Sequence, residues 1–360
     1  METFLCDTKI ISGPGAVAAL KGLGAKRALV VTDPYFYENG TAQRVAGASG
    51  AEHIQYFHQV MPDPSVALAA RGTALVKEFA PDVLVALGGG SAMDCAKAMA
   101  YFSGSEAKFV AIPTTSGSGS EVTDFAILTH EGVKHPLVDE KLRPDMAILD
   151  SDLLDTMPPK LVADGGFDVL CHALEAYTAQ NAGDFTDMLA KEAFCTAYAL
   201  LPASYGGRKD VRLRIHNAAT MAGMAFTRAG LGLCHAMAHS LGGAFHIPHG
   251  RLNAILLPAV IGCNAYRAGE KYARLAQSAG IGGSAVTVGV RNLKNALVRL
   301  RRELDMPATL AEAGVKPAEV WGRQRELVAA ALADPCCVTN PVPVEEFMVR
   351  KVLEEVTGRV

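Results

Sequence analysis

The sequence lacks any large excess of charge of one sign. It contains 34 Lys and Arg residues against 37 Asp and Glu residues in 360, a formal net charge of −3. Binding to nucleic-acid phosphates requires concentrated positive charge, so we expect no nucleic-acid partner. Apolar residues make up 50% of the chain, a share typical of a folded enzyme and too high for a disordered chain.

Long apolar runs and paired cysteine motifs are also missing. The longest apolar run, Ala254–Cys263, contains Pro258 and is far shorter than the ~20 residues of a membrane-spanning helix. The start of the chain, METFLCDTKI, contains acidic residues and no apolar segment of the secretory type. The 8 cysteines form no Cys-x-x-Cys pair. We therefore expect reduced thiols, no membrane contact and a cytoplasmic location.

The first part of the chain, to residue 157, alternates short apolar runs with helical patterns. Uninterrupted apolar runs are typical of parallel strands that are buried on both faces. The expected strands are Arg27–Thr32, Val83–Leu87, Phe109–Ile112 and Met146–Leu149. Helices are expected at Ala67–Phe79 and Ser91–Phe102. This alternation predicts an α/β domain with a parallel sheet at residues 1–157.

The second part of the chain has a helical pattern throughout. The segment Leu231–Phe245 is apolar almost all round apart from its histidines, which predicts a buried helix. Prolines 158 and 159 mark the boundary, because a proline pair interrupts regular structure. We therefore predict an all-helical domain at residues 158–360. One helix of it is indicated by an apolar stripe at three- and four-residue spacing: Val290, Leu293, Leu297, Leu300 and Leu304.

Two glycine-rich loops follow expected strands. Residues 87–91 (LGGGS) precede a helix, where glycines let the backbone approach an anion and free N–H groups point at it. Residues 113–120 (PTTSGSGS) follow the next strand and offer hydroxyl groups. A tight turn explains either loop alone, but both at strand ends predict a nucleotide site. Asp33 ends the first strand and would accept hydrogen bonds from a ribose, unless it only forms an Asp-Pro turn.

Histidines and a carboxylate recur at helical spacing in the second part. His235 and His239 are four residues apart, as are Asp168 and His172, while His249 lies in a Pro-His-Gly turn. Side chains four apart share one helix face and can reach one ion. Any single histidine has an ordinary alternative role as a hydrogen-bonded or exposed ring. Together the residues predict a divalent cation site of Fe²⁺, Zn²⁺, Mn²⁺, Co²⁺ or Ni²⁺ type, and no His-Glu-x-x-His protease motif is present.

Taken in order, the motifs resemble those of the iron-containing (group III) alcohol dehydrogenases. Within that family they resemble the 1-propanol dehydrogenase branch, which is associated with propanediol-degrading bacterial microcompartments. The resemblance covers nearly the whole chain. The segments that carry it are residues 88–97 (GGGSAMDCAK), 114–123 (TTSGSGSEVT), 168–175 (DVLCHALE), 235–239 (HAMAH) and 248–250 (PHG).

The resemblance implies a dinucleotide-binding α/β domain, an all-helical metal domain and an active site between them. It implies NAD(H)-dependent interconversion of a short-chain primary alcohol, for example 1-propanol, and its aldehyde. It places Fe²⁺, or Zn²⁺ or another divalent metal, on Asp168, His172, His235 and His249, and gives His239 a role in proton movement. It assigns cofactor contacts to Asp33, Gly88, Gly89, Gly90, Ser91, Asp94, Thr114, Thr115, Ser118 and Lys134. Asp33 matches the residue that favours NAD over NADP.

The resemblance further implies a homodimer, a small alcohol or aldehyde as substrate, and shell or lumen proteins as partners if the chain is encapsulated. Two segments depart from the family pattern. Residues 164–167 (DGGF) replace the usual Thr-Gly pair, and Val342 stands where the family has arginine after Asn-Pro. His246 lies between ligand positions without matching one, which suggests a pocket-lining or structural role.

Two other functions remain open at this point. One is a zinc-dependent enzyme of the same fold, similar to glycerol or glycerol-phosphate dehydrogenase or to dehydroquinate synthase. A phosphorylated substrate is disfavoured because residues 167–177 and 231–245 contain no Lys or Arg. The other is a non-catalytic microcompartment component or nucleotide sensor. Retention of all four ligand-type residues argues against that alternative.

Overall fold

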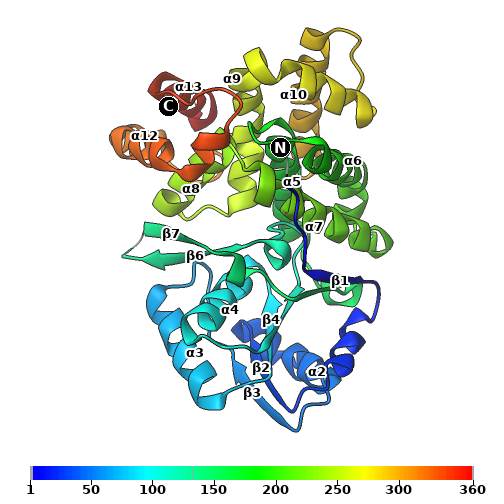
Figure 1. The fold of residues 1–360 in the computed structure, drawn as a ribbon. Coiled ribbons are helices and arrows are strands. Elements are labelled where there is room, and N and C mark those ends of the chain that lie inside the picture. Colours follow the sequence, from blue (N-terminus) through cyan, green and yellow to red (C-terminus); the bar gives the residue numbers. More distant parts are fainter. Residues whose placement is uncertain (1–2, 132, 359–360) are drawn as a thin grey trace. The chain divides into compact units, whose positions relative to one another are not determined.

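The computed structural model describes residues 3–131 and 133–358. The chain folds into two compact units, one formed by Leu5–Met157 and the other by Pro158–Val360 with the first four residues. The first unit is built around a parallel sheet and the second is helical (Figure 1). The fold class predicted from the sequence is therefore confirmed.

The first unit contains a six-stranded sheet in which all neighbouring strands are parallel. Its order is β1-β8-β5-β4-β2-β3. The four strands predicted from apolar runs are the four inner ones, and both edge strands escaped prediction. The bounds are β1 Lys9–Ser12, β2 Arg27–Val31, β3 His53–Phe57, β4 Val83–Gly88, β5 Lys108–Pro113 and β8 Met146–Leu149.

Helices cover both faces of this sheet because alternate strand residues point to opposite sides. Leu29 and Leu84 pack in the core beneath α3 and α4, whereas Val30 and Val85 pack in the core beneath η1 and α2. Figure 1 shows α3 and α4 together on one side of the sheet. The covering elements are η1 Ala16–Leu23, α1 Pro34–Glu38, α2 Thr41–Ala48, α3 Val66–Phe79 and α4 Gly90–Ser103.

The chain reverses its direction of travel through the sheet between β2 and β4. From β2 it continues through α2 to β3 on one side, and from β4 it continues through α4 to β5 on the other. Open α/β sheets bind ligands at the carboxyl ends of strands that flank such a reversal. The remaining elements of this unit are a hairpin of β6 Phe125–His130 and β7 Val133–Val138, with short turns η2 Ser120–Val122, η3 Glu140–Leu142 and η4 Ser151–Leu154.

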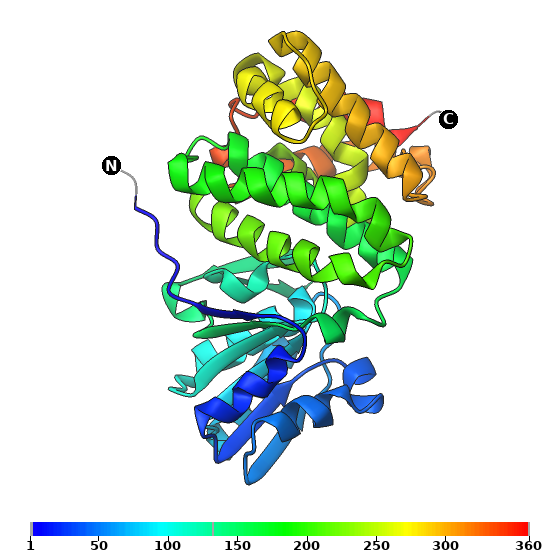
Figure 2. The same cartoon turned by 90° about the vertical axis from the view of Figure 1, so that its right-hand side faces the viewer.

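The second unit consists of helices packed around a long buried helix, α5. Figure 2 shows α6 and α7 side by side, in agreement with their extensive contacts. The first helices are α5 Pro159–Thr178, α6 Asp184–Tyr205, α7 Arg212–Ala229, α8 Leu233–Phe245 and α9 His249–Ser278. The later ones are α10 Val286–Glu303, α11 Pro317–Gly322, α12 Gln324–Ala333 and α13 Glu346–Thr357, with short turns η5 Lys209–Val211 and η6 Pro335–Thr339.

Helix α5 is buried on all sides over its second half. Every residue from Gly166 to Thr178 is buried. Gly166 permits close packing of α6, because a Cβ there would lie 2.2 Å from a methyl carbon of Leu201. Polar side chains carried on such a helix need partners, since burial without hydrogen bonds or a bound ion is costly. Helix α5 therefore brings its polar residues into the interior of the unit.

The apolar stripe predicted near residue 300 is confirmed as the inner face of α10, with Leu293, Leu297 and Leu300 buried. The helix predicted at Leu231–Phe245 is confirmed as α8, which begins two residues later. In the described part of the chain, none of the helices combines the length and apolar character needed to span a membrane.

Candidate metal centre and nucleotide-binding edge

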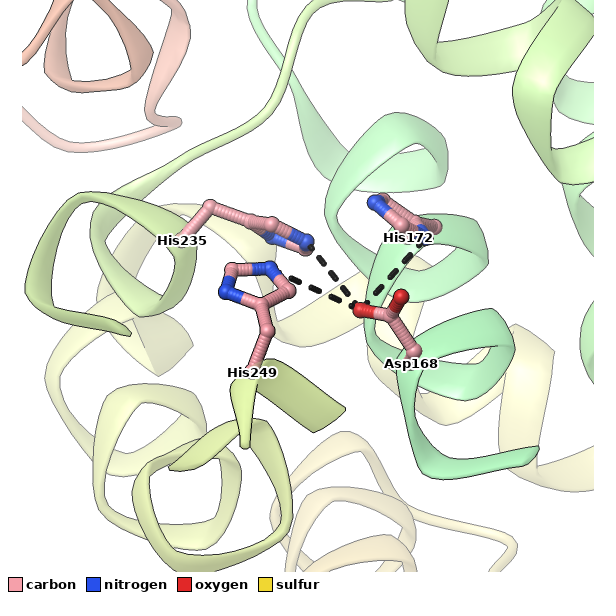
Figure 3. Close-up of side chains that lie close together, drawn as sticks. All are labelled: Asp168, His172, His235 and His249. Atoms are coloured by element: carbon pink, nitrogen blue, oxygen red, sulfur yellow. Dashed lines mark ion pairs between the residues drawn. The ribbon is translucent and has the colours of Figure 1, made fainter. Parts of the chain in front are cut away.

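Three helices of the second unit bring four ligand-type side chains together. Helix α5 carries Asp168 and His172, α8 carries His235, and α9 begins at His249. One donor atom from each lies within 4.8 Å of the others. Figure 3 shows the three imidazoles arranged around the Asp168 carboxylate. The structure thus brings together the four residues to which the family resemblance assigns the metal.

The spacing of these donors suits a shared cation better than direct hydrogen bonds. Asp168 Oδ1 lies 3.8 Å from His172 Nδ1, 3.9 Å from His235 Nε2 and 3.6 Å from His249 Nε2. Hydrogen bonds to nitrogen are ~2.7–3.2 Å long, whereas donors ~2.1 Å from one tetrahedral ion lie ~3.4 Å apart. His172 Nδ1 is buried without a hydrogen-bond partner. An orphaned buried nitrogen beside a carboxylate fits a cation ligand.

Glu175 orients one of these imidazoles. Glu175 lies one turn after His172 on α5, and its Oε2 is 2.6 Å from His235 Nδ1. Donation from Nδ1 leaves the lone pair of Nε2 directed at the four-donor group, the arrangement usual for a histidine ligand. Burial raises the pKa of Glu175 to about 7, although backbone N–H groups of Cys234 and Gly232 favour its charged form.

Asn253 supports the centre from one turn into α9. Its Nδ2 donates to Asp168 Oδ1 at 2.8 Å, and the residue is fully buried. Burial raises the pKa of Asp168, an effect opposed by His172 and by this amide. Burial also lowers the pKa of His235 well below its usual range. A neutral imidazole is the form that binds metals.

Exposure is graded across the centre. The His235 side chain is 1% exposed and that of His172 is 7% exposed, whereas that of His249 is 33% exposed. A catalytic metal site must keep one side open for substrate. The open side of this cluster is therefore the side of His249.

His239 has a different neighbour from the one its spacing suggested. Its Nδ1 is 2.8 Å from Asp334 Oδ2, and its ring stacks on that of His249 with centroids 5.2 Å apart. Burial raises the pKa of Asp334, but the hydrogen bond and charge of His239 bring the net shift below the usual value. The i,i+4 spacing suggested that His239 and His235 bind one ion together. In the structure, His239 is not part of the four-donor group that contains His235. The family resemblance had assigned His239 to proton movement instead.

Two further ligand-like groups contain cysteine, but their donor atoms are already engaged. In the group of Cys171, Glu175 and His235, burial raises the pKa of the Cys171 thiol well above its usual value. In the group of His239, Asp334 and Cys336, burial and the Asp334 charge do the same to Cys336. Without a cation, both thiols therefore favour the protonated form.

The two glycine-rich loops of the first unit meet at the carboxyl ends of β4 and β5. A Cβ on Gly89 would lie 3.3 Å from Thr115 Oγ1, and one on Gly90 would lie 3.3 Å from Ser118 Oγ. Gly88 has a φ of +149°, which L side chains rarely adopt. Helix α4 starts at this point without any side-chain cap. The Ala92 N–H already donates to Gly89 O at 3.0 Å, so the N–H groups of Gly90 and Ser91 are the ones at this helix start that suit an anion.

Asp33 lies beside this turn, since a Cβ on Gly88 would be 3.8 Å from Asp33 Oδ2. Asp33 also caps α1, because Oδ1 accepts from the Phe36 N–H at 3.0 Å. Thr114 Oγ1 is buried without a hydrogen-bond partner. Lys134 lies on β7 and forms an ion pair of 2.8 Å with Asp63. The edge has the glycine turn, open helix start and hydroxyl groups that a dinucleotide requires.

Sequence reasoning gave no role to the lysine of the GGGSAMDCAK segment. Lys97 is fully buried, and its Nζ donates to Thr123 O at 2.9 Å, Thr123 Oγ1 at 2.8 Å and Phe125 O at 2.9 Å. Burial lowers its pKa to about 8, while Asp94 opposes that shift. Lys97 thus fastens α4 to the segment that follows the second loop.

His246 ends α8 in a left-handed conformation with φ of +55°, and its N–H bonds Gly242 O at 2.9 Å. It is exposed and lies outside the four-donor group.

Asn340 is fully buried and forms reciprocal hydrogen bonds of 2.9 Å with Asn264. Glu175, Asn253 and Asp334 were missed as supporting residues. Glu175 follows His172, and Asn253 follows His249, by about one helical turn, and that spacing could have indicated both. Asp334 has no such local signal, because it is 95 residues from His239.

Comparison with known proteins identifies the family of this chain. Residues 7–151 match "Iron-containing alcohol dehydrogenase", and residues 162–357 match "Fe-containing alcohol dehydrogenase family, C-terminal". The 1-propanol dehydrogenase PduQ of Salmonella typhimurium is 39% identical, over 99% of this chain and 100% of the relative. The NADPH-dependent butanol dehydrogenase of Clostridium saccharobutylicum is 38% identical, over 98% and 97%. The solved iron-containing alcohol dehydrogenase of Thermococcus thioreducens matches with a TM-score of 0.90 at 34% identity, covering 98% of each chain. The chain belongs to the iron-containing alcohol dehydrogenase family.

Proposed function

We propose that the protein interconverts a short-chain primary alcohol and its aldehyde, for example 1-propanol and propanal, with NAD(H) as the hydride carrier. The observation that carries this proposal is the convergence of one carboxylate oxygen and three imidazole nitrogens at 3.6–3.9 Å. Family membership and the 39% identity to a 1-propanol dehydrogenase support the substrate class.

A divalent cation would be bound by Asp168, His172, His235 and His249, and we propose Fe²⁺ as the natural ion. Mixed imidazole and carboxylate donors without thiolate suit Fe²⁺, Zn²⁺ and their neighbours. When bound, the cation would polarise the substrate oxygen, and the nicotinamide would take up or release the hydride. With one anionic ligand and three neutral imidazoles, the site would keep a net charge of +1 for that task.

The chain's own residues handle the proton. Oxidation of an alcohol to an aldehyde releases one hydride and one proton, so a group near the site must accept the proton. We assign this to His239, whose Asp334 partner fixes Nδ1 as the protonated nitrogen and leaves Nε2 as the acceptor. Glu175 and Asn253 keep His235 and Asp168 in place.

The nucleotide would be held in the first unit, which we propose to be the cofactor domain, residues 1–157. Gly88, Gly89, Gly90 and Ser91 would bind the diphosphate through the open start of α4. Asp33 would accept hydrogen bonds from the adenosine ribose hydroxyls, and its negative charge would disfavour a 2′-phosphate. The remaining contacts are proposed for Asp94, Thr114, Thr115, Ser118 and Lys134. Residues 158–360 would form the metal and substrate domain.

We further propose that the chain forms a homodimer and is located in the cytoplasm or inside a bacterial microcompartment. The similarity to the 1-propanol dehydrogenase PduQ supports the microcompartment location, whereas the homodimer rests on the family resemblance alone. Light scattering after size-exclusion chromatography tests the dimer. Co-purification with isolated shells tests the encapsulation, and recovery only in the shell-free fraction would refute it.

The function is tested with anaerobically purified protein loaded with Fe²⁺. We expect NADH-dependent reduction of propanal and butanal, and little activity with dihydroxyacetone or a phosphorylated triose. Dihydroxyacetone as the best substrate would favour the glycerol-dehydrogenase-like alternative. NADH binding without turnover of any aldehyde would favour the non-catalytic one.

Two histidine variants make the test specific. His249→Ala should lose bound metal and turnover but keep NADH binding, and its loss should exceed the ~10–100-fold typical of a supporting residue. His246→Asn is the matched control, because asparagine tolerates the left-handed conformation at that position. Unchanged metal content in His249→Ala would remove His249 from the ligand set.

A further inference from the structure

Asp164 and Arg251 form a two-point ion pair between the helices that carry the candidate ligands. Arg251 Nε is 3.2 Å from Asp164 Oδ1, and Nη2 is 2.8 Å from Oδ2. Asp164 lies one turn before Asp168 on α5, and Arg251 lies two residues after His249 on α9. The pair therefore links the two helix segments closest to these ligands.

The helix backbones touch beside this pair. A Cβ on Gly250 would lie 1.9 Å from the carbonyl oxygen of Asp164, so only glycine fits there. The first turn of α9 consequently lies directly on α5. A shift of either helix at this contact would change the distance between His249 Nε2 and Asp168 Oδ1, which is 3.6 Å.

The ion pair is partly shielded from solvent, which strengthens it as a link between α5 and α9. The Asp164 side chain is 11% exposed and that of Arg251 is 28% exposed. A guanidinium bound through two nitrogens fixes both the distance and the orientation of its partner, which a lysine does not.

We propose that the Asp164–Arg251 pair positions α9 against α5 and thereby sets the affinity of the four-donor group for a divalent cation. This rests on the proposed function, because it takes those four residues as the metal ligands. Neither Asp164 nor Arg251 is itself a ligand. Both act through Asp168 and His249 and are positioning residues.

Co²⁺ binding to the metal-free protein tests the proposal without any activity measurement. Arg251→Met removes the ion pair and should weaken Co²⁺ binding by ~10–100-fold, as other supporting residues of metal ligands do. Arg251→Lys keeps the charge but loses the two-point geometry, and should give an intermediate loss. If Arg251→Met does not fold, Arg251→Lys provides the test in its place. Wild-type affinity in the folded variants would overturn the proposal.

Arg274→Met is the matched control. Arg274 lies on the same helix, and its ion pair with Glu270 is exposed, at 66% and 75%. We expect its Co²⁺ affinity to stay within about twofold of wild type, since exposed pairs contribute little. An equal loss in Arg274→Met and Arg251→Met would show a general effect on α9 and overturn the positioning role.

A double-mutant cycle separates the pair from two independent effects. Asp164→Asn leaves the Arg251 cation without its partner and should weaken Co²⁺ binding. The double variant Asp164→Asn/Arg251→Met should lose less than the product of the two single losses, because both changes remove one interaction. Multiplicative losses would overturn the proposal. Failure of the wild-type protein to bind Co²⁺ would instead overturn the metal centre itself.

Discussion

Glu175 Oε2 lies 2.6 Å from His235 Nδ1, while the two Glu175 oxygens also accept the N–H groups of Gly232 and Cys234 at 3.0 and 2.7 Å. The carboxylate thus joins the start of α8 to the orientation of one candidate ligand. Glu175→Gln replaces one oxygen by an NH₂ group, which cannot accept these bonds. We expect metal affinity to fall by ~10–100-fold. Chelator competition with Co²⁺ measures it, and an unchanged affinity would contradict the orienting role.

Asp334 and His239 give a prediction that separates proton handling from metal binding. Asp334→Asn keeps the shape of the side chain but removes its negative charge. This weakens the hydrogen bond to His239 Nδ1, which is 2.8 Å long in the wild type. We expect kcat to fall while metal content is unchanged, and His239→Ala to lower kcat by ~10²-fold or more. Metal analysis and initial rates on the same preparations check this. Loss of metal in either variant would assign His239 to the metal instead.

The sequence predicts single helices and strands better than it predicts the contacts between them. The inner strand β4 is buried along its whole length, so its composition is apolar and unmistakable. The edge strand β3 reads His-Ile-Gln-Tyr-Phe with mixed exposure, and such a pattern does not distinguish a strand from a loop. Apolar periodicity therefore located the core of the sheet and missed both of its edges.

The candidate centre shows the same limit. Asp168 and His172 share a face of α5 because of their spacing, and this is readable from the sequence. The partner of His239 comes from 95 residues away in the chain. Spacing alone grouped His239 with His235, because it does not say which nitrogen of an imidazole is already bound. Tertiary hydrogen bonds decide that, and only the fold shows them.

Asp33 gives a test of cofactor choice, which matters because one relative is an NADPH-dependent enzyme. Asp33→Ser keeps a side-chain cap for the Phe36 N–H but removes the negative charge. We expect the ratio of NADPH to NADH efficiency to rise by ~10-fold, which corresponds to ~1.4 kcal/mol of relieved repulsion. Steady-state kinetics with both cofactors measure the ratio. A wild type that uses both equally well would refute the role of Asp33.

Lys97 gives a prediction for stability. Lys97→Met would remove the charged donor of three hydrogen bonds, to Thr123 O, Thr123 Oγ1 and Phe125 O at 2.8–2.9 Å in the wild type. A hydrogen bond to a charged group contributes ~1.5–3 kcal/mol, so we expect a loss of ~3 kcal/mol in the free energy of unfolding of the first unit. The control is Lys108→Met, whose ion pair with Asp145 is exposed and should matter by less than ~1 kcal/mol. Equal losses in urea denaturation would contradict the anchoring role.

Asp94, one turn before Lys97, makes the stability of the first unit depend on pH. Burial raises its pKa from the usual 3.8 to about 6, although Lys97 and the Ser120 hydroxyl favour the charged form. Because the folded state binds this proton more tightly than the unfolded state, the resulting stabilisation is complete below pH 3.8 and is lost as pH rises through about 6. Asp94→Asn has no proton to lose there. The free energy of unfolding of wild type minus variant should therefore decrease between these two pH values and stay level above pH ~7. Urea titrations across this range measure the difference, and an increase with pH would show that Asp94 is stabilised as a carboxylate.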